Sequence, residues 1–547
     1  MSRNSGELPM NASPSVIVIG GGHNGLTAGC YLARAGATVT LIEATDKLGG
    51  MTSTNPVLPN APGHRINEGA MDASLIRTSG IIEDLQLSRY GLKQIEMDPV
   101  YAALGPNGES LCIFDDPERT AEDIRRFSPA DARAFIDMSN ELDPLMDIMG
   151  PFMNANPMRP FGKRLAGGVL SATRHPRHLA AASRYFTASQ AELIDERFTH
   201  AMVKAPLAAL PCFVPISEDG TGWALIFFAM HHRSGVARFA GGTGAVTDAL
   251  GRCFAAKGGQ VRMSSVVEEI LVHRGRAHGV RLVGGEEIYA DAVIAANNVK
   301  TTLTELLPEG ALPEHMRERA QHIPTSSTHA SSFKLDMALS GKLTLSAHQE
   351  NRHDGVDLRR PGLVYGTFED HVEAWAACAR GELPEPLAGV GIIPSAADPS
   401  QAPEGQDTFW FWTGIAPSNP KTPWSELEET AAEGAINHAS KVIEGLRELE
   451  IDRQVMTPPK FAERFRVPDG NVYHVDPIAT RFGPMRPAPG FSGFTTPVEG
   501  LFLSGGGMHP SAGICGTPGK LAAEVAMKAL KLKSGGSSPR RRTGASA

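Results

Sequence analysis

The chain has 547 residues, of which 41% are hydrophobic and 20% charged, and its formal net charge is −8 at pH 7. This composition is ordinary for a globular protein, and the length suffices for two or three connected domains with a large core. The negative charge gives no reason to expect a nucleic-acid partner. The six cysteines form neither a C-x-x-C pair nor a metal-ligand spacing, which argues against a disulfide framework, a zinc site or a redox dithiol. A reducing cytoplasm is therefore the expected location.

Both ends of the chain are polar. Residues 1–14 lack the apolar segment of a secretory signal, so we expect a disordered N-terminus. Residues 533–547 are basic and of low complexity, which predicts a disordered tail. No run of 18 apolar residues occurs between them, so the sequence predicts no membrane-spanning helix.

The first structured stretch predicts a strand, a glycine-rich turn and a helix. Residues 16–19 are apolar and β-branched, which is typical of a buried strand. The turn has the pattern G-x-G-x-x-G. Gly20 permits a tight turn, Gly22 lets a pyrophosphate approach bare backbone, and Gly25 lets the helix pack close to the strand. The free N–H groups at the start of the helix favour the phosphates of a dinucleotide.

A second strand, residues 38–42, ends at an acid. Glu43 lies about 20 residues beyond the glycines, where a carboxylate accepts hydrogen bonds from a ribose 2′-OH. An acid at this position favours FAD or NAD over NADP.

The residues within and after the glycine motif favour FAD over NAD as the cofactor. GGGHNGL at residues 20–26, followed by KLGG at residues 47–50, resembles the phytoene-desaturase-like branch of the flavoprotein superfamily that also includes amine oxidases. The resemblance implies noncovalent FAD. It also implies cofactor contacts by His23 and Asn24 in the turn and by Lys47, Gly49 and Gly50 after it.

Residues 81–235 read as a largely helical part of a substrate domain. Ser128 and Pro129 predict a helix start, as cap and first residue. Residues 151–190 contain no acid but several arginines among apolar side chains, which predicts either a basic surface touching a membrane or a solvated helical cap. Residues 223–230 are apolar enough for a pocket wall or a core, and the pair His231 and His232 that follows is more often structural than catalytic.

The middle of the chain returns to the cofactor. The glycine-rich stretch at residues 241–244 opens a helix and resembles the flavin-side loop of the same family. Residues 264–297 then alternate between strands and turns, and the resemblance places the backbone of Val267 against adenine. No second G-x-G-x-x-G follows a strand, so we expect no nicotinamide-binding domain and no nicotinamide as the main electron partner. Further on, FWFW at residues 409–412 predicts either an apolar substrate tunnel or core packing.

The C-terminal part is a second anchor for the cofactor. Residues 501–503 predict a strand, and Thr517 and Pro518 predict the cap and first residue of the last helix, whose N-terminus could stabilise a reduced flavin. The motif RP-x-PG, then G-x-G-x-HP-x-x-G-x-x-G, resembles the tail of carotenoid desaturases. This resemblance places three glycines near the cofactor: Gly505, Gly506 and Gly516.

Three side chains in this tail bear on the reaction. Met508 and Cys515 depart from the residues usual in the family, which leaves the reaction type open, and Cys515 raises the rival hypothesis of a covalent thioether to the flavin. His509 has a pKa near neutrality in water, so it either moves a proton during catalysis or shapes the flavin site by hydrogen bonding.

Together these features predict an α/β protein. A Rossmann-like FAD-binding domain of the amine oxidase and phytoene desaturase type would be built from separated segments, with an inserted α+β substrate domain. The expected cofactor segments are 15–80, 236–300 and 461–532, and the expected substrate segments are 81–235 and 301–460.

The resemblance implies an oxidoreductase that removes hydrogen from C–C bonds of an apolar, isoprenoid- or polyene-like substrate, with hydride transfer to the flavin. The electron partner is left open between oxygen, a quinone and the flavin's own redox cycling. We expect no metal and a cytoplasmic protein, in which residues 151–190 either contact a membrane peripherally or form a solvated helical cap. The alternatives are an oxidase of an amine or other small molecule and a flavoprotein with a mainly structural or interaction role.

Overall fold

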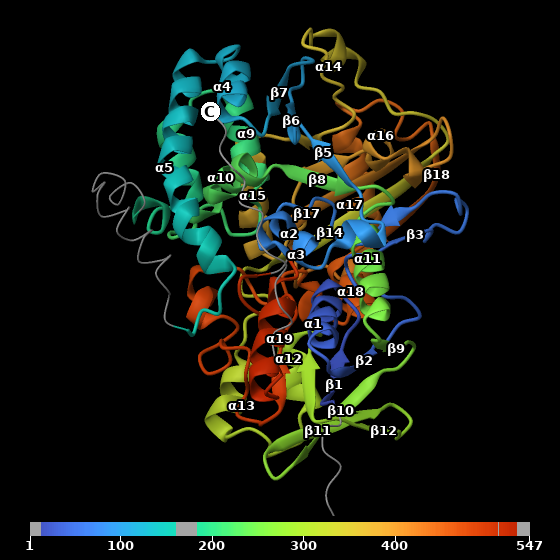
Figure 1. Cartoon of the computed structure of the whole chain (residues 1–547). Coiled ribbons are helices and arrows are strands. Elements are labelled where there is room, and N and C mark those ends of the chain that lie inside the picture. The colour runs from blue at the N-terminus through green and yellow to red at the C-terminus, as the bar shows by residue number, and fades with distance from the viewer. Residues whose placement is uncertain (1–12, 160–182, 512, 533–547) are drawn as a thin grey trace, which may run out of the picture.

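A computed structural model describes residues 13–159, 183–511 and 513–532 (Figure 1). Two sheets dominate it, one in the lower and one in the upper part of Figure 1. Residues 160–182, which carry much of the basic stretch expected to touch a membrane, lie outside the described residues. So do residues 1–12 and 533–547, so the two predictions of disorder are not addressed for them.

The lower sheet is parallel and five-stranded, with strand order β19-β13-β1-β2-β9. Its central strand β1 has the apolar run of the sequence, and Val18 pairs with Leu41 on one side and Ile294 on the other. Strands buried on both faces need such continuous apolar runs. The strands come from three distant stretches of the chain: β1 (Ser15–Ile19), β2 (Thr38–Ile42), β9 (Gln260–Arg262), β13 (Ala292–Ala295) and β19 (Leu501–Leu503).

Helix α1 (His23–Arg34) joins β1 to β2 and packs between α11 (Gly244–Ala256) and α19 (Thr517–Ala529). The crossings are close because the contact residues are small. A Cβ on Gly519 would lie 2.1 Å from the carbonyl oxygen of Asn24, and one on Gly29 would lie 2.9 Å from the ring of Phe254. This β-α-β unit confirms the predicted fold class.

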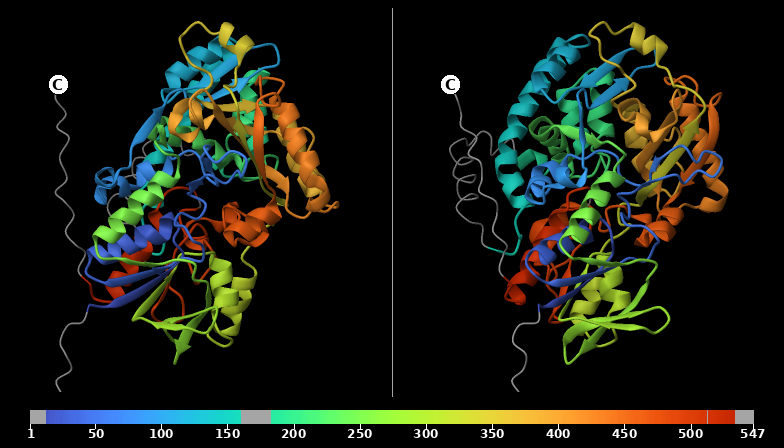
Figure 2. Two further views of the ribbon diagram at one scale, coloured as in Figure 1. Left: turned by 90° about the vertical axis from the view of Figure 1, so that its right-hand side faces the viewer. Right: turned by 45° about the vertical axis from the view of Figure 1, so that its right-hand side comes forward.

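A small antiparallel sheet is attached to this layer, as Figure 2 also shows. The alternation of strands and turns predicted for residues 264–297 is correct. The remaining elements near the parallel sheet are β10 (Val267–His273), β11 (Arg276–Leu282), β12 (Glu287–Tyr289), β3 (Thr54–Asn55), β4 (Ile66–Asn67), α2 (Leu75–Ser79), α3 (Ile81–Asp84), α12 (Val299–Thr301) and α13 (Glu314–Gln321).

The upper sheet is mixed and seven-stranded, with strand order β18-β14-β17-β16-β15-β6-β7. Its neighbours run antiparallel except β15 and β6, which are parallel. Its strands are β6 (Tyr101–Leu104), β7 (Ser110–Ile113), β14 (Ala330–Leu339), β15 (Gly362–Tyr365), β16 (Gly389–Ile392), β17 (Asp407–Pro417) and β18 (Glu450–Met456).

Helices flank the upper sheet, and α5 (Pro129–Met153) begins as the sequence predicts. The hydroxyl of Ser128 accepts a hydrogen bond from the N–H of Asp131, and Pro129 is the first helical residue. The other elements of this layer are α4 (Pro117–Arg125), α8 (Gln190–Arg197), α9 (Ala201–Ala209), α10 (Ile226–Ser234), α14 (Ser346–Glu350), α15 (Phe368–Ala379), α16 (Pro394–Ala397), α17 (Trp424–Ala439), α18 (Pro458–Phe465), and the paired strands β5 (Gln94–Met97) and β8 (Val236–Phe239).

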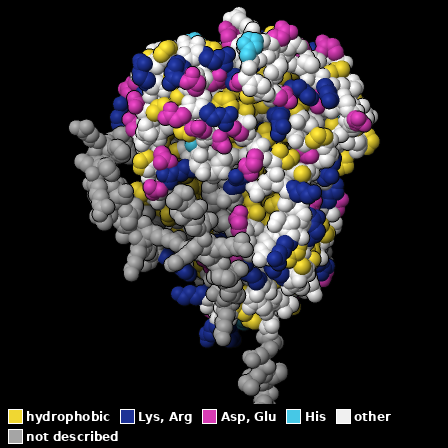
Figure 3. All heavy atoms as spheres, turned by 45° about the horizontal axis from the view of Figure 1, so that its top comes forward, with side chains coloured by type: hydrophobic (Ala, Val, Ile, Leu, Met, Phe, Trp, Pro, Cys, Tyr) yellow, Lys and Arg dark blue, Asp and Glu magenta, His cyan; other side chains and the backbone are white. Residues whose placement is uncertain are grey.

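The upper surface carries both signs of charge side by side (Figure 3). Ion pairs of this kind occur between α10 and α5, where Arg233 pairs with Asp143 and also with Asp147, 2.6 Å away. Within the described ranges, no helix is both long and apolar enough to span a bilayer.

One helix start differs from the sequence prediction. Gly516, in the left-handed region at φ 69°, is the cap of α19, and Thr517 is its first helical residue. The Thr517 hydroxyl contacts Asn154 at 3.3 Å instead of capping the helix. A glycine reaches the left-handed conformation without strain, which explains why it takes the cap position.

Candidate cofactor and substrate cavity

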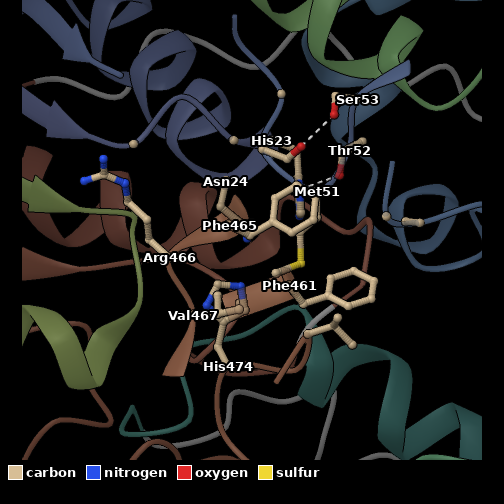
Figure 4. Close-up of a pocket in the computed structure, with 18 of the residues that line it drawn as sticks. His23, Asn24, Met51, Thr52, Ser53, Phe461, Phe465, Arg466, Val467 and His474 are labelled. Atoms are coloured by element: carbon tan, nitrogen blue, oxygen red, sulfur yellow. Dashed lines mark hydrogen bonds between the residues drawn. The ribbon is translucent and has the colours of Figure 1, made fainter. Parts of the chain in front are cut away.

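The two layers enclose a cavity of about 930 Å³. Its lower part is lined by the first glycine-rich turn, the end of β2 and residues 47–53. Its upper part is lined by side chains of the seven-stranded sheet and of α18. Figure 4 shows two distant stretches meeting here, with His23, Met51 and Thr52 on one side and Phe461, Val467 and His474 on the other.

The glycines of the turn have different physical roles. Gly20 has φ +100°, and a Cβ on Gly25 would lie 2.0 Å from the carbonyl oxygen of Gly20. Both positions therefore require glycine for the backbone itself. Around Gly22 the nearest atom to an added Cβ is the carbonyl oxygen of Gly49, at 3.8 Å. Gly22 lies on the cavity wall, so its missing side chain leaves space for a ligand to approach the start of α1.

Glu43 lies at the end of β2 on the cavity wall and is only 9% exposed. One carboxylate oxygen accepts a hydrogen bond from the N–H of Gly21 at 2.7 Å. The other accepts from the N–H and the hydroxyl of Thr45, both at 2.9 Å. The acid thus holds the glycine-rich turn in addition to facing the cavity.

Two histidines lie on the cavity wall. Nδ1 of His23 is 3.0 Å from the hydroxyl of Thr52. His474 lies against the C-terminal glycines, because a Cβ on Gly506 would be 2.6 Å from its ring. Burial lowers the pKa of each histidine to about 4, so both are neutral at pH 7. Sequence reasoning missed His474, since a lone histidine in an irregular stretch gives no local signal.

Most of the predicted cofactor residues come together on this wall. Those that line the cavity are Gly20, Gly22, His23, Asn24, Glu43, Lys47, Gly49, Gly50, Val267 and Gly506. Three others, Gly25, Gly505 and Gly516, do not line it. Gly505 has φ +86°, and a Cβ there would lie 2.7 Å from the carbonyl oxygen of Asn297, so its role is in the turn after β19. Direct contact of these residues with the cofactor stays a prediction.

His509 is 1% exposed and does not line the cavity. Its Nε2 lies 2.9 Å from the carbonyl oxygen of Phe152, and the two rings meet edge to face with centroids 4.8 Å apart. Burial lowers the pKa of His509 to about 4. These contacts favour the structural alternative for His509, and its catalytic role stays a prediction.

The thiol of Cys515 is also buried and away from the cavity. Burial raises its pKa to about 12, so the nucleophilic thiolate is disfavoured. This environment argues against the rival hypothesis of a thioether to the flavin.

The upper lobe of the cavity is aromatic. Trp410 and Trp412 of β17 line it, whereas Phe409 and Phe411 point into the core on the other face of the sheet. Side chains alternate along a strand, so the two tryptophans of FWFW line the cavity while the two phenylalanines pack in the core. Phe227, from the predicted apolar run, also lines this lobe. The other lining residues of this lobe include Tyr101, Leu210, Phe213, Val390, Ile392 and Tyr473.

The pair His231 and His232 is structural. Nδ1 of His231 lies 2.5 Å from the carbonyl oxygen of Phe227, one turn earlier in α10. Nδ1 of His232 lies 3.1 Å from the carbonyl oxygen of Asp115. Neither histidine lines the cavity.

The acid in the aromatic lobe is neutralised. Asp72 accepts a hydrogen bond from Nε of Arg238 at 2.9 Å and another from the hydroxyl of Tyr101 at 3.1 Å. The side chain of Arg238 is 3% exposed, so the ion pair is shielded from water. The lobe consequently offers apolar surface and little net charge.

A parallel nucleotide-binding sheet and an aromatic lobe that share one cavity define the two-layer class of flavin-dependent oxidoreductases. Residues 25–371 match the model of the flavin containing amine oxidoreductase family, and the chain belongs to that family. The family binds FAD, and the open space at Gly22 and the acid at Glu43 fit this cofactor.

Two curated relatives match almost the whole chain. Pyridine nucleotide-disulfide oxidoreductase domain-containing protein 2 of Mus musculus is 28% identical, covering 94% of this chain and 93% of its own length. The neurosporene-forming phytoene desaturase of Cereibacter sphaeroides is 26% identical, covering 95% of each chain. Both confirm the resemblance predicted from the motifs.

A solved structure supports the fold. An oxidoreductase from Methanosarcina mazei has a TM-score of 0.58 at 15% identity, covering 94% of this chain and all of that one. At this identity the likeness shows the fold alone.

Proposed function

We propose that the chain dehydrogenates C–C bonds of an apolar, isoprenoid- or polyene-like molecule, passing hydride to FAD. The observation that carries this proposal is the aromatic lobe, which opens on the same cavity as the glycine-rich turn. An apolar substrate gains free energy from burial there, at about 25 cal/mol per Å² of apolar surface. The relative named as a phytoene desaturase acts on such a molecule, which agrees with this choice.

Bound FAD supplies the hydride acceptor. The chain's own residues supply binding and orientation. Gly22 and the start of α1 receive the phosphates, Glu43 faces the ribose, and Trp410 and Trp412 hold the apolar substrate. Oxygen or a quinone as electron acceptor and membrane contact through residues 151–190 complete the proposal. The contacts of His509 favour a structural role for this residue over a proton-moving one.

An amine oxidase is the second candidate, because aromatic faces also attract cations. The pairing of Asp72 with Arg238 disfavours it, since the carboxylate that lines the aromatic lobe is already neutralised and is not free to bind a cationic substrate. A flavoprotein with a mainly structural role is the third candidate, and it predicts bound FAD that no substrate reduces.

Anaerobic reduction of the purified holoenzyme separates the three candidates. The visible absorbance of the flavin is followed after adding either phytoene in detergent or an aliphatic amine such as putrescine. We expect bleaching by the isoprenoid hydrocarbon and none by the amine. Bleaching by the amine alone would establish the oxidase. No bleaching by either, with normal bleaching by dithionite, would support the structural role and contradict the proposal.

A further inference from the structure

A fully buried arginine braces the C-terminal wall of the cavity. Arg486 has no exposed surface. Its Nη2 donates to the carbonyl oxygens of Tyr473 at 3.0 Å, Val475 at 3.2 Å and Gly506 at 3.1 Å, and its Nε donates to that of Met508 at 3.2 Å. One side chain therefore ties together two segments more than 30 residues apart in the sequence.

The braced segments form part of the cavity wall. Tyr473 and His474 of the first segment and Gly506 of the second line the cavity, while Arg486 does not. The guanidinium thus lies behind the wall. His474 has a positive φ of 62°, a conformation that costs free energy in a non-glycine residue unless its surroundings hold it. The hydrogen bond from Arg486 to the adjacent carbonyl of Tyr473 is one such constraint.

The bond to Gly506 also sets the direction of a donor. A trans peptide is planar, and its C=O and N–H point in opposite directions. Because the carbonyl of Gly506 points to Arg486, the N–H of Gly507 points away from the guanidinium. The hydrogen bond from Arg486 thereby fixes the orientation of the Gly506–Gly507 peptide, with its N–H on the side opposite the arginine.

The charge of Arg486 is only partly compensated. Among the described residues, no carboxylate lies within salt-bridge distance of its guanidinium, and the acid that acts on it electrostatically is Asp476. That carboxylate is already bound by the hydroxyl of Ser327 and the amide of Asn471, each at 2.6 Å. Burial lowers the pKa of Arg486 to about 9, while Asp476 opposes the shift, so the guanidinium stays charged at pH 7.

We propose that Arg486 is a positioning residue for FAD: it shapes the wall formed by residues 473–475 and 506–508, and its buried positive charge favours the reduced, negatively charged flavin over the oxidised one. This inference rests on the predicted placement of the flavin beside Gly506 and is independent of the substrate. Charges interact strongly across a wall of low dielectric, so a guanidinium need not touch the cofactor to act on it.

Three variants separate the geometric from the electrostatic role. Arg486→Met removes both the hydrogen bonds and the charge, Arg486→Lys keeps a charge without the planar fork, and Asp476→Asn removes the nearby negative charge. Arg380→Met, at an exposed arginine, is the control. The measurements are the dissociation constant of FAD and the midpoint potential of the bound flavin, neither of which requires the substrate.

For Arg486→Met we expect FAD affinity to fall at least tenfold, and the preference for reduced over oxidised flavin to fall about tenfold, which is about 30 mV for a two-electron couple. Arg486→Lys should weaken FAD binding but keep the potential. Asp476→Asn should raise the potential. If Arg486→Met does not fold, the other two variants decide. An unchanged affinity for FAD in Arg486→Lys would overturn the geometric role of Arg486. A midpoint potential that is unchanged or lowered in Asp476→Asn would overturn its electrostatic role.

Discussion

The carboxylate of Glu43 accepts a hydrogen bond from the backbone N–H of Gly21 across 2.7 Å. The acid at the end of β2 therefore contacts the glycine-rich turn after β1 directly. This contact gives Glu43 two roles: it fixes the turn, and it lies on the wall of the cavity that fits FAD.

Replacement of Glu43 should lower FAD occupancy. Glu43→Ala removes a charged acceptor, and hydrogen bonds to charged groups contribute roughly 1.5–3 kcal/mol, so we expect affinity for FAD to fall about tenfold or more. Glu43→Gln keeps one oxygen acceptor and should lose less. Flavin absorbance after equilibrium dialysis measures the effect, with Glu83→Ala, at an exposed acid of α3, as the control. Wild-type affinity in Glu43→Ala would refute the assignment.

Substitution by alanine should impair FAD binding at Gly22 but folding stability at Gly25. In Gly22→Ala the added Cβ has no atom closer than 3.8 Å, so the variant should fold normally but bind FAD at least tenfold more weakly. In Gly25→Ala the Cβ would lie 2.0 Å from a backbone oxygen, so the fold itself should lose about 1–3 kcal/mol or more. Thermal unfolding of the apoproteins and FAD titration give the two readouts. Equal stability of the two variants would contradict the packing argument.

His509→Gln tests the role of the buried histidine. Because His509 contacts Phe152 and not the cavity, we expect lower stability, by about 1–3 kcal/mol, with flavin reduction by substrate slowed less than tenfold. Catalysis by His509 predicts instead a slowing of about 10²-fold or more with FAD retained. Chemical denaturation and anaerobic stopped-flow reduction on the same preparation distinguish these results.

Stability should fall on acidification between about pH 6.5 and pH 4. Burial lowers the pKa of five histidines from 6.5 to about 4: His23, His231, His438, His474 and His509. In this window the unfolded chain binds more protons than the folded one, so the stability present above pH 6.5 is lost as the pH falls. Each histidine can contribute up to about 3 kcal/mol.

Urea denaturation at several pH values measures this loss. His509→Gln should make the free energy of unfolding depend less steeply on pH, because it removes the contribution of one buried histidine. A stability that does not change between pH 7 and pH 5 would show that these histidines are accessible to protons in the folded state.

The alternation along β17 predicts different outcomes for adjacent residues. Trp412 faces the cavity and donates to the hydroxyl of Ser332 at 3.2 Å, so Trp412→Ala should weaken binding of an apolar substrate while retaining FAD. Phe411 is fully buried in the core, so Phe411→Ala should cost about 3–5 kcal/mol of stability. If the KM for the substrate were unchanged in Trp412→Ala, Trp412 of β17 would not contact the substrate.

The sequence by itself determined the β-α-β start of the cofactor layer. Strand, turn and helix there are encoded by neighbouring residues: an apolar run, glycines at fixed spacing, and the acid Glu43 at the end of β2. The cap of α5 by Ser128 is equally local. Such signals can be read from sequence because the atoms that interact lie within a few residues of each other.

Only the tertiary structure decided which side chains pair in and behind the walls of the cavity. Arg486 and the carbonyl of Gly506, Asp72 and Arg238, and His509 and Phe152 are separated by 20, 166 and 357 residues. No local pattern encodes such pairs, because they form only when separate segments fold together. Burial then changes their chemistry, and it keeps His509, whose pKa is near neutral in water, uncharged at pH 7.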